Sequence, residues 1–235
     1  MISVVVRTRN ERQWIGRCLS ALKHQDCGEV EILVVDNEST DGTLDVVRKF
    51  ECRLLTITAG EFSHGRSINL GIAEAKGEFV AIVSGHCIPV NSHWLRRLRL
   101  AFADPAVAGV YGRQEPLPDS SDFDKRDLWT AFGLDRRVQY RDNFFHNANS
   151  MIRRNVWQTL PFNETLSGVE DRDWAKRALA RGHRVVYEPA AGVYHFHGIN
   201  HGRDQARATR VARVIELINN GSTGHPEQDP KRGNG

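Results

Sequence analysis

The sequence has no apolar run long enough to span a bilayer, so no membrane-spanning helix is expected. It also lacks an excess of charge of one sign, since 32 Lys and Arg stand against 29 Asp and Glu, a net charge of +3. So slight an excess gives no reason to expect a nucleic-acid partner. The start, MISVVVRTRN, has no charged segment followed by a longer apolar stretch and a cleavage site. We therefore expect a cytoplasmic protein rather than a secreted one.

Cysteine is scarce, and its spacing indicates no special chemistry. The four cysteines form no CxxC pair, which argues against a zinc knuckle or a disulfide framework, and we expect free thiols. Glycine is missing from RTRNE, the segment after the first predicted strand, where a dinucleotide-binding fold would carry G-x-G-x-x-G. The chain is therefore not expected to be a dehydrogenase.

What the sequence does contain is an alternation of short β-branched runs with longer amphipathic stretches. This alternation is typical of βαβ units, and it predicts an α/β fold with a Rossmann-like, mostly parallel central sheet flanked by helices. At 235 residues the chain is expected to form one domain. The strand candidates of the first half are residues 2–6, 32–35, 54–58, 79–83 and 108–111.

The pattern breaks at 114–145 into an irregular or partly helical connection. It then resumes with a strand at 148–152, a short helix near Val156, a helix over 171–181 that ends at Gly182, and a strand in HRVVYEP. We divide the single domain, 1–218, into one half over 1–113 and another over 114–218. The tail, 219–235, is predicted to be disordered.

The last amphipathic stretch, 203–218, carries arginine at positions 203, 207, 210 and 213, spaced for one helix face. A basic amphipathic helix can contact anionic lipid, so peripheral contact with the inner face of a membrane is one interpretation. A solvated helix face explains the same spacing and is the preferred interpretation.

Polar residues that follow a strand are the first candidates for ligand contact, because ligands of open parallel sheets bind outside the carboxyl ends of the strands. Asp36 ends the second predicted strand and can accept hydrogen bonds from a base N–H or a ribose hydroxyl. The polar residues 39–43 that follow are typical of a turn and a helix cap. We therefore predict that Asp36 contacts a ligand.

Two segments, SVVVRTRNE and EILVVDNESTDGT, resemble the start of the inverting family-2 glycosyltransferases. The resemblance continues in order through HGRSINLGIAEAKGEFVAIVSGHCIPVNSHWL, NANSMIRRNVW and PFNETLSGVEDRDWAKRALARGHRVVYEPAAGVYHFHG. It covers roughly residues 1–198. It implies a GT-A fold in which 1–113 binds a nucleotide-sugar donor and 114–218 supplies the acceptor side.

The resemblance also implies where the donor nucleotide lies. Thr8, Glu11 and Asp36 would hold its base and ribose, with Asn69 close by. This chain has arginine at positions 7 and 9, where the family usually has Pro and Tyr before Asn-Glu. Side chains two residues apart lie on the same side of a strand, so we expect Arg7 and Arg9 to bring extra positive charge to the nucleotide site.

A larger departure follows the fourth strand, where Ser84-Gly85-His86 replaces the Asp-x-Asp that normally binds a divalent cation bridging the donor diphosphate. Mg²⁺ prefers oxygen ligands, whereas imidazole suits Mn²⁺ better and Zn²⁺ or Ni²⁺ best. His195 and His197, in YHFHG, fall where family members often place a histidine near the diphosphate and metal. A cation site built from His86 with His195 or His197 is therefore one interpretation.

The other interpretation needs no metal. His86, His64, Arg66 and Arg113 would then stabilise the leaving phosphates directly, as preorganised cationic donors can. A divalent cation, Mn²⁺ rather than Mg²⁺, and metal independence both stay open at this point.

The pair Glu170-Asp171 matches the catalytic Glu-Asp pair of the family, directly before the amphipathic DWAKRALARG. Inverting displacement at an anomeric carbon requires a carboxylate to deprotonate the incoming hydroxyl, and Asp171 is the predicted base. Helix capping is the alternative role, because carboxylates favour a helix N-terminus. The predicted acceptor is a glycan or a lipid-linked hydroxyl.

Two rival functions share this architecture. A non-catalytic nucleotide-sugar or glycan-binding module would explain the missing Asp-x-Asp carboxylates, although Glu170-Asp171 argues against it. A nucleotidyltransferase would carry a glycine-rich loop with a lysine after its first strand, and RTRNE contains neither. The sugar, the nucleotide base and the oligomeric state stay open.

Overall fold

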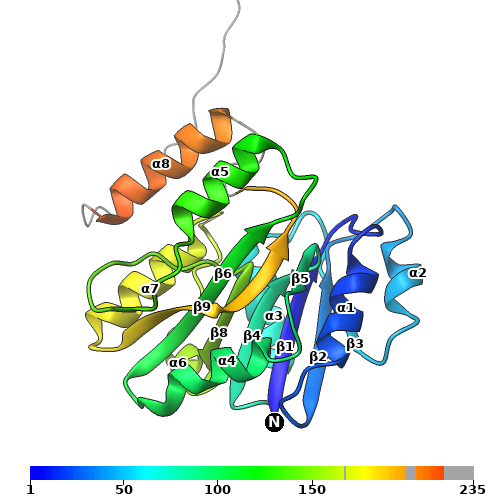
Figure 1. Ribbon diagram of the computed structural model, residues 1–235, viewed down its shortest axis with the longest axis horizontal. Helices are drawn as coiled ribbons and strands as arrows, with labels where there is room; N and C mark the ends of the chain where they lie inside the picture. Colours follow the sequence, from blue (N-terminus) through cyan, green and yellow to red (C-terminus); the bar gives the residue numbers. More distant parts are fainter. Residues whose placement is uncertain (167, 199–204, 220–235) are drawn as a thin grey trace, which may run out of the picture.

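The computed structural model describes residues 1–166, 168–198 and 205–219, and within them a mixed nine-stranded sheet lies between two layers of helices (Figure 1). The strands follow the order β3-β2-β1-β4-β8-β6-β9-β5 across the sheet, and β7 pairs with β9. Their bounds are β1 Ile2–Thr8, β2 Val30–Asp36, β3 Arg53–Thr56, β4 Phe79–Ser84, β5 Cys87–Pro89, β6 Val107–Pro116, β7 Arg137–Gln139, β8 Asn149–Arg153 and β9 Arg184–His195.

The first half of the sheet is parallel, as the sequence predicts. β1 pairs in parallel with β2 and β4, and β2 pairs in parallel with β3. All six residues of β4 are buried. Helices cover both faces of such a sheet, and this is why β1 and β4 read as continuous apolar runs rather than as alternating ones.

The second half contains the strands predicted at 148–152 and in HRVVYEP, as β8 and β9, but the sequence did not predict their antiparallel pairing. β8 runs antiparallel to both β4 and β6, while β9 is parallel to β6 and antiparallel to β5 and β7. The segment 114–145 is more regular than expected, since it holds the end of β6, helix α5 and β7. β6 extends to Pro116, so the predicted boundary at 113 falls inside a strand, and the sheet continues through both halves.

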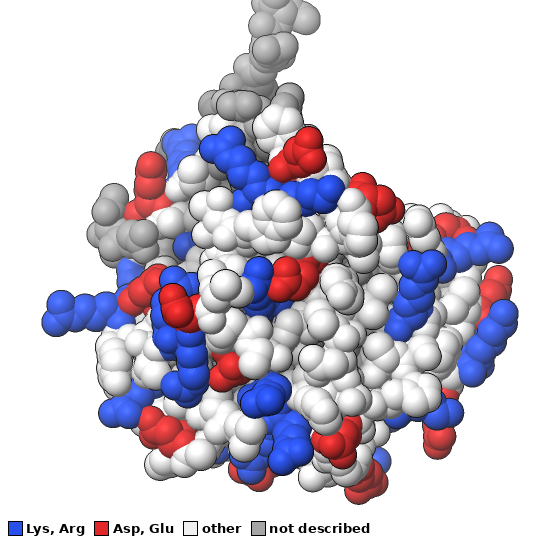
Figure 2. Space-filling view, in the orientation of Figure 1, with Lys and Arg blue, Asp and Glu red and all other residues white. Residues whose placement is uncertain are grey.

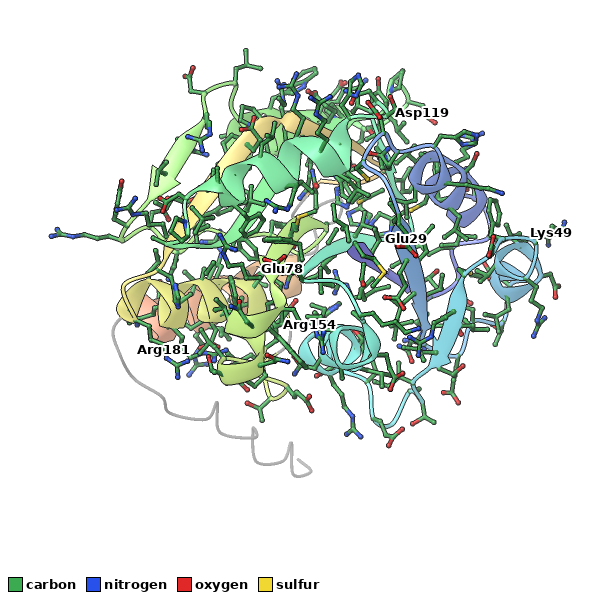
Figure 3. The ribbon with its side chains drawn as sticks, turned by 90° about the horizontal axis from the view of Figure 1, so that it is seen from below. Glu29, Lys49, Glu78, Asp119, Arg154 and Arg181 are labelled. Carbon is green, nitrogen blue, oxygen red and sulfur yellow. The ribbon has the colours of Figure 1, made fainter. Side chains whose placement is uncertain are left out.

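The helices divide between the two faces of the sheet, which Figure 3 separates by viewing the molecule from below. α1, α2 and α4 contribute to one buried cluster, and α3, α6 and α7 contribute to the other. In α1, α3, α4 and α7 the buried residues recur every three or four positions, as a helix that covers a sheet requires. Their bounds are α1 Ile15–Lys23, α2 Thr43–Val47, α3 His64–Glu74, α4 Trp94–Leu100, α5 Asp122–Ala131, α6 Arg154–Thr159, α7 Glu170–Ala180 and α8 Gln205–Asn219, with a short 3-10 turn at Ala101–Ala103.

The predicted amphipathic stretch near the C-terminus forms α8, whose end contacts α7 through Lys176 and the carbonyl of Ile218. Asn219, which the sequence assigned to the tail, belongs to this helix. Position 203 of the arginine series and residues 220–235 lie outside the described residues. Within the described ranges, no helix is both long and apolar enough to cross a bilayer. On the face drawn in Figure 2, basic and acidic side chains are intermingled, in agreement with the small net charge.

Candidate active site

The carboxyl ends of β1 and β2 border a cavity of about 150 Å³. Thr8 ends β1 and accepts, through its carbonyl, a hydrogen bond of 3.0 Å from the backbone N–H of Asn37, the residue that follows β2. Both residues line the cavity, and Phe62 lines it from the loop before α3. Arg7 and Arg9 line it as well, as their alternation along the strand predicts.

Polar atoms in this cavity lack partners within the described part of the chain. The hydroxyl of Thr8 and both amide atoms of Asn37 are buried without a hydrogen bond. Buried polar groups are nearly always satisfied in folded proteins, by the protein itself or by something bound to it. The cavity therefore offers donors and acceptors to a polar ligand, as a nucleobase or a ribose requires.

A second cavity, of about 130 Å³, lies against the first turn of α7. Glu170 and Asp171 both line it. The Oδ2 atom of Asp171 accepts a hydrogen bond from the backbone N–H of Asn147 at 3.3 Å, and its Oδ1 atom accepts one from that of Arg172 at 2.8 Å. Burial, and then the charge of Glu170, raises the pKa of Asp171 to about 7. A carboxyl group tuned in this way suits general-base work near neutral pH.

Asp171 also has the position that the alternative role requires, because it lies in the first turn of α7 and its Oδ1 atom accepts the backbone N–H of Arg172. The N-cap residue of α7 is Val169, and no side chain makes the cap hydrogen bond. The carboxylate of Glu170 instead accepts the N–H of Gly168 at 3.0 Å, which closes the turn before the helix. Asp171 therefore lines the cavity and also accepts a backbone N–H at the start of the helix.

The two cavities share one wall. Four side chains line both of them: Arg7, His64, Ser84 and His86. None of the four is acidic, and three of them are basic residue types. An anionic group that links a ligand in the first cavity to a reacting atom in the second would lie against this wall.

Three histidines form a cluster at one end of this wall. His86 follows β4, and the antiparallel pairing of β5 with β9 places Cys87 opposite His195. The Nε2 atoms of His86 and His195 lie 3.0 Å apart, and the ring of His197 lies 4.7 Å from that of His86. Burial, and then the neighbouring His86, lowers the pKa of His197, which favours a neutral imidazole.

The cluster fits an ion that prefers nitrogen. Two nitrogens bound to one ion at about 2.1 Å each lie roughly 3 to 3.4 Å apart, and His86 and His195 meet that separation. The Oε1 atom of Glu11 lies 2.6 Å from Nδ1 of His86 and fixes its ring, as carboxylates do for ligating histidines. Because its donors are imidazole nitrogens, this set suits Mn²⁺ or Zn²⁺ better than Mg²⁺.

A third hollow, of about 670 Å³, is also lined by Glu11 and His86. The rings of Trp14 and Phe196, 4.9 Å apart, form part of its wall. Its two carboxylates are engaged, Glu11 with His86 and Asp41 with Thr43, so it offers no base comparable to Asp171.

The structure gives two predicted nucleotide contacts a different environment. Asp36 lines neither cavity of the shared wall, and its oxygens accept the hydroxyl of Ser39 at 2.5 Å and the N–H of Ser39 at 3.0 Å. Asn69 is equally committed, because its amide group bonds to Trp157 at 2.8 Å and to Glu164 at 2.9 Å. Both side chains hold the surrounding chain in place.

The two arginines predicted to contact the diphosphate also lie away from the shared wall. Arg66 forms an ion pair of 3.2 Å with Glu61, and Arg113 forms one of 2.8 Å with Glu115. Neither lines the two cavities. Nearby carboxylates therefore neutralise both guanidinium groups.

Two residues at the cavities were missed by the analysis of the sequence. In the part of the chain that the structure describes, Asn37 presents a side-chain amide without a partner in the first cavity, and Asn147 presents an Nδ2 atom without a partner in the second. Asn37 directly follows Asp36, so its place at the strand edge was a usable signal. Asn147 lies in NANSM, one of the segments that carry the family resemblance, where no single residue stood out.

Relatives of known or assigned activity match most of the chain. It is 26% identical over 178 residues to the O-antigen chain rhamnosyltransferase WbaN of Salmonella anatum, covering 71% of this chain and 56% of the relative. It is 29% identical over 195 residues to the glycosyltransferase AglE of Haloferax volcanii, covering 79% and 64%. It is 38% identical over 204 residues to the poly(ribitol-phosphate) beta-N-acetylglucosaminyltransferase TarS of Staphylococcus aureus, covering 78% and 33%. The chain thus spans less than two thirds of the length of each.

Solved structures show the same fold. The mannosyltransferase PcManGT from Pyrobaculum calidifontis, in complex with GDP-Man and Mn²⁺, superposes with a TM-score of 0.72 at 22% identity, covering 97% of this chain and 66% of that one. S. aureus TarS 1–349 in complex with UDP gives a TM-score of 0.66 at 21% identity, covering 92% and 65%.

The predicted α/β fold of the GT-A type is confirmed by these neighbours. The family model described as glycosyl transferase family 2 matches residues 3–160, which is more than half of the 235-residue chain. The chain belongs to glycosyl transferase family 2.

Proposed function

We propose that this chain is an inverting glycosyltransferase that moves a sugar from a nucleotide-sugar donor to a hydroxyl group of a glycan or lipid-linked acceptor. One observation carries the proposal. The cavity at the strand ends and the cavity at Asp171 share a basic wall, so a donor can lie across it with its anomeric carbon beside a carboxylate. Membership of the family and the nucleotide-sugar complexes of PcManGT and TarS support the same conclusion.

The base and ribose of the donor would occupy the first cavity. Thr8 and Asn37 supply its unsatisfied polar atoms, and Glu11 lines it beside them. Asp36 would act behind them, by holding the turn at Ser39 and therefore the position of Asn37. We accordingly assign the direct contact at the end of β2 to Asn37.

The reaction would take place in the second cavity. The carboxylate of Asp171 takes the proton of the acceptor hydroxyl, and the oxygen attacks the anomeric carbon on the side opposite the diphosphate. The bond from that carbon to the diphosphate oxygen breaks, and the nucleoside diphosphate leaves with the electron pair. The basic residues of the shared wall stabilise the charge that collects on the leaving oxygen.

A divalent cation, when bound, would neutralise part of the diphosphate charge. The residues that would hold it are His86 and His195, with His197 beside them. Glu11 would orient His86 through Nδ1. Mn²⁺ or Zn²⁺ fits this donor set, because it contains imidazole in place of the carboxylates that Mg²⁺ prefers.

The location of the chain is part of the same proposal. A lipid-linked acceptor would be reached from the cytoplasmic side of a membrane, and α8 offers a described, exposed basic side chain at Arg213. Peripheral contact would then present the acceptor hydroxyl to Asp171 without a membrane-spanning segment in the described residues.

The experiment that tests the function combines a binding panel with a transfer assay. Nucleotide sugars are screened by thermal shift with and without Mn²⁺, because a ligand of the native state raises the melting temperature. The donor that binds is then offered to glycan and lipid-linked acceptors, and release of nucleoside diphosphate is measured. Transfer supports the proposal. Donor binding with no transfer, and with no slow hydrolysis of the donor, would favour the non-catalytic binding module.

A further inference from the structure

Arg7 occupies the centre of the shared wall. It lies at the end of β1, where the sheet register places it beside Val35 on one side and Ser84 on the other. Its guanidinium group extends toward α3 and toward the segment before β8, and it lines both cavities. A ligand that extends from the nucleotide cavity to Asp171 must pass this group.

The contacts of Arg7 are all with neutral acceptors. One terminal nitrogen lies 3.2 Å from Nδ1 of His64, and the other lies 3.4 Å from the hydroxyl of Ser84 and 3.5 Å from the carbonyl of Asn147. Its Nε atom is buried and has no hydrogen-bond partner among the described residues. Because a guanidinium only donates, the contact with His64 requires a lone pair on Nδ1 and places the proton of a neutral imidazole on Nε2.

No carboxylate among residues 1–166, 168–198 and 205–219 forms an ion pair with Arg7. Arg66 and Arg113, in contrast, are both paired with glutamates. Removing a charge from water without a counter-ion is costly, so a partly buried guanidinium with neutral neighbours is a ready site for an anion. The geometry of the guanidinium also matches phosphate oxygens two at a time.

Ser84 explains why this charge stays available. It stands at the first position of the motif in which the family carries carboxylates, and its hydroxyl touches the guanidinium. A carboxylate at the same place would lie within ion-pairing distance of Arg7 and would neutralise it. Arginine at 7 and serine at 84 therefore act as a matched pair of departures from the family pattern.

We propose that Arg7 binds the diphosphate of the donor and supplies the positive charge that a bridging cation would otherwise give, so that the chain binds nucleoside diphosphates without a divalent cation. This inference rests on the proposed function and specifies how its donor site works. His64 lines the same wall and holds one end of the guanidinium group through Nδ1. The cation at the histidine cluster, when present, is then an addition to donor binding and not a condition for it.

Calorimetry in EDTA tests the inference with UDP, dTDP, GDP and CDP and with their nucleosides as probes. The wild-type chain is expected to bind at least one diphosphate in EDTA. Arg7→Ala should lower the affinity for that diphosphate about 10- to 100-fold, the usual effect of losing charged hydrogen bonds. It should change the affinity for the nucleoside less than twofold. Arg7→Lys should retain part of the affinity, because lysine keeps the charge without the planar fork. Arg66→Ala, the matched arginine control, should change neither.

Ser84→Asp provides a second test that leaves Arg7 in place. The new carboxylate should pair with the guanidinium group and lower the affinity for the diphosphate about tenfold in EDTA. Addition of Mn²⁺ should restore part of that affinity. If Arg7→Ala fails to fold, Arg7→Lys and Ser84→Asp decide the question.

Three results would overturn the inference while leaving the proposed function intact. The first is a wild-type chain that binds the diphosphate only in the presence of a cation. The second is an Arg7→Ala variant that binds the diphosphate as tightly as Arg66→Ala does. The third is an Arg7→Ala variant whose affinity for the nucleoside falls as much as its affinity for the diphosphate. If no diphosphate binds under any condition, with or without Mn²⁺, the proposed function fails and this inference fails with it.

Discussion

The Nε2 atoms of His86 and His195 face each other at 3.0 Å, across the junction between the loop after β4 and the end of β9. Only one of the two nitrogens can carry a proton in a hydrogen bond between neutral rings, and an ion bound by both would replace that proton. The Glu11 carboxylate, 2.6 Å from the far nitrogen of His86, fixes the ring for either arrangement. The pair therefore sets which cations this site can select.

Titration of the protein with metal alone should show this selectivity. Mn²⁺ and Zn²⁺ are expected to bind at least tenfold more tightly than Mg²⁺, because imidazole replaces oxygen ligands. Glu11→Gln should lower Mn²⁺ affinity about 10- to 100-fold by releasing the ring of His86. His93→Ala is the matched control, since His93 lies 3.5 Å from the carboxylate of Asp26 and belongs to neither cavity. Equal affinity for Mg²⁺ and Mn²⁺ would contradict the assignment.

Replacement of Asp171 by asparagine should abolish most turnover and leave donor binding unchanged. General-base catalysis contributes about 10²- to 10⁴-fold, so Asp171→Asn should lower kcat by that order while the affinity for nucleoside diphosphate stays unchanged. Asp173→Asn is the matched control on the same helix, because Asp173 pairs with Arg177 at 2.7 Å outside the cavity. Near-normal turnover of Asp171→Asn on the true acceptor would move the role of base to Glu170.

Asn37 should contribute more to nucleoside binding than its position in a turn suggests. Its amide atoms are the buried, unpartnered pair of the first cavity, and a lost hydrogen bond costs about 0.5 to 1.5 kcal/mol. Asn37→Ala should therefore lower the affinity for the nucleoside by about three- to tenfold, with little change in the melting temperature of the protein. Asp36→Ala should lower the melting temperature instead, since it frees Ser39. A nucleoside affinity that depends on Asp36 and not on Asn37 would restore the original prediction for Asp36.

Much of the fold could be read from the sequence because burial on both faces leaves a plain signal. β1 and β4 are runs of apolar residues that no surface strand would carry, and polar residues mark their ends. β9 was harder, because Pro189 and Gly192 interrupt its pattern and a register shift breaks its pairing with β6. A strand continued past such residues is recognised from its partners, which sequence periodicity does not reveal.

The site was predictable to the level of segments and not always to that of side chains. Asp36 and Asn37 are adjacent polar residues at a strand end, and once the strand stops, alternation no longer decides which one faces the cavity. Asn69 binds partners almost ninety residues away, at Trp157, so its structural role left no local trace. Glu115 is different: it follows Arg113 by two positions on β6, and its ion pair was readable from strand alternation.

The pH dependence of turnover should report the carboxyl group of Asp171. It must be ionised to accept a proton, and burial followed by the charge of Glu170 raises its pKa to about 7. We expect kcat to fall about tenfold for each pH unit below that value and to level off above it. Glu170→Gln removes the second cause and should move the inflection to lower pH, whatever it does to the maximal rate.

Stability should change in the opposite direction with pH. The unfolded carboxyl ionises near 3.8 and the folded one near 7, so the folded chain binds more protons between those values. The free energy of unfolding contributed by this group therefore falls as pH rises from about 4 to 7, and above 7 the cost of the buried charge is fully present. Asp171→Asn cannot ionise, so its melting temperature should decline less than that of the wild type between pH 5 and pH 8. Two results together would contradict both predictions: melting temperatures of the two proteins that change equally between pH 5 and pH 8, and an inflection in kcat that does not move in Glu170→Gln. They would show that Asp171 titrates normally and that another group controls the rate.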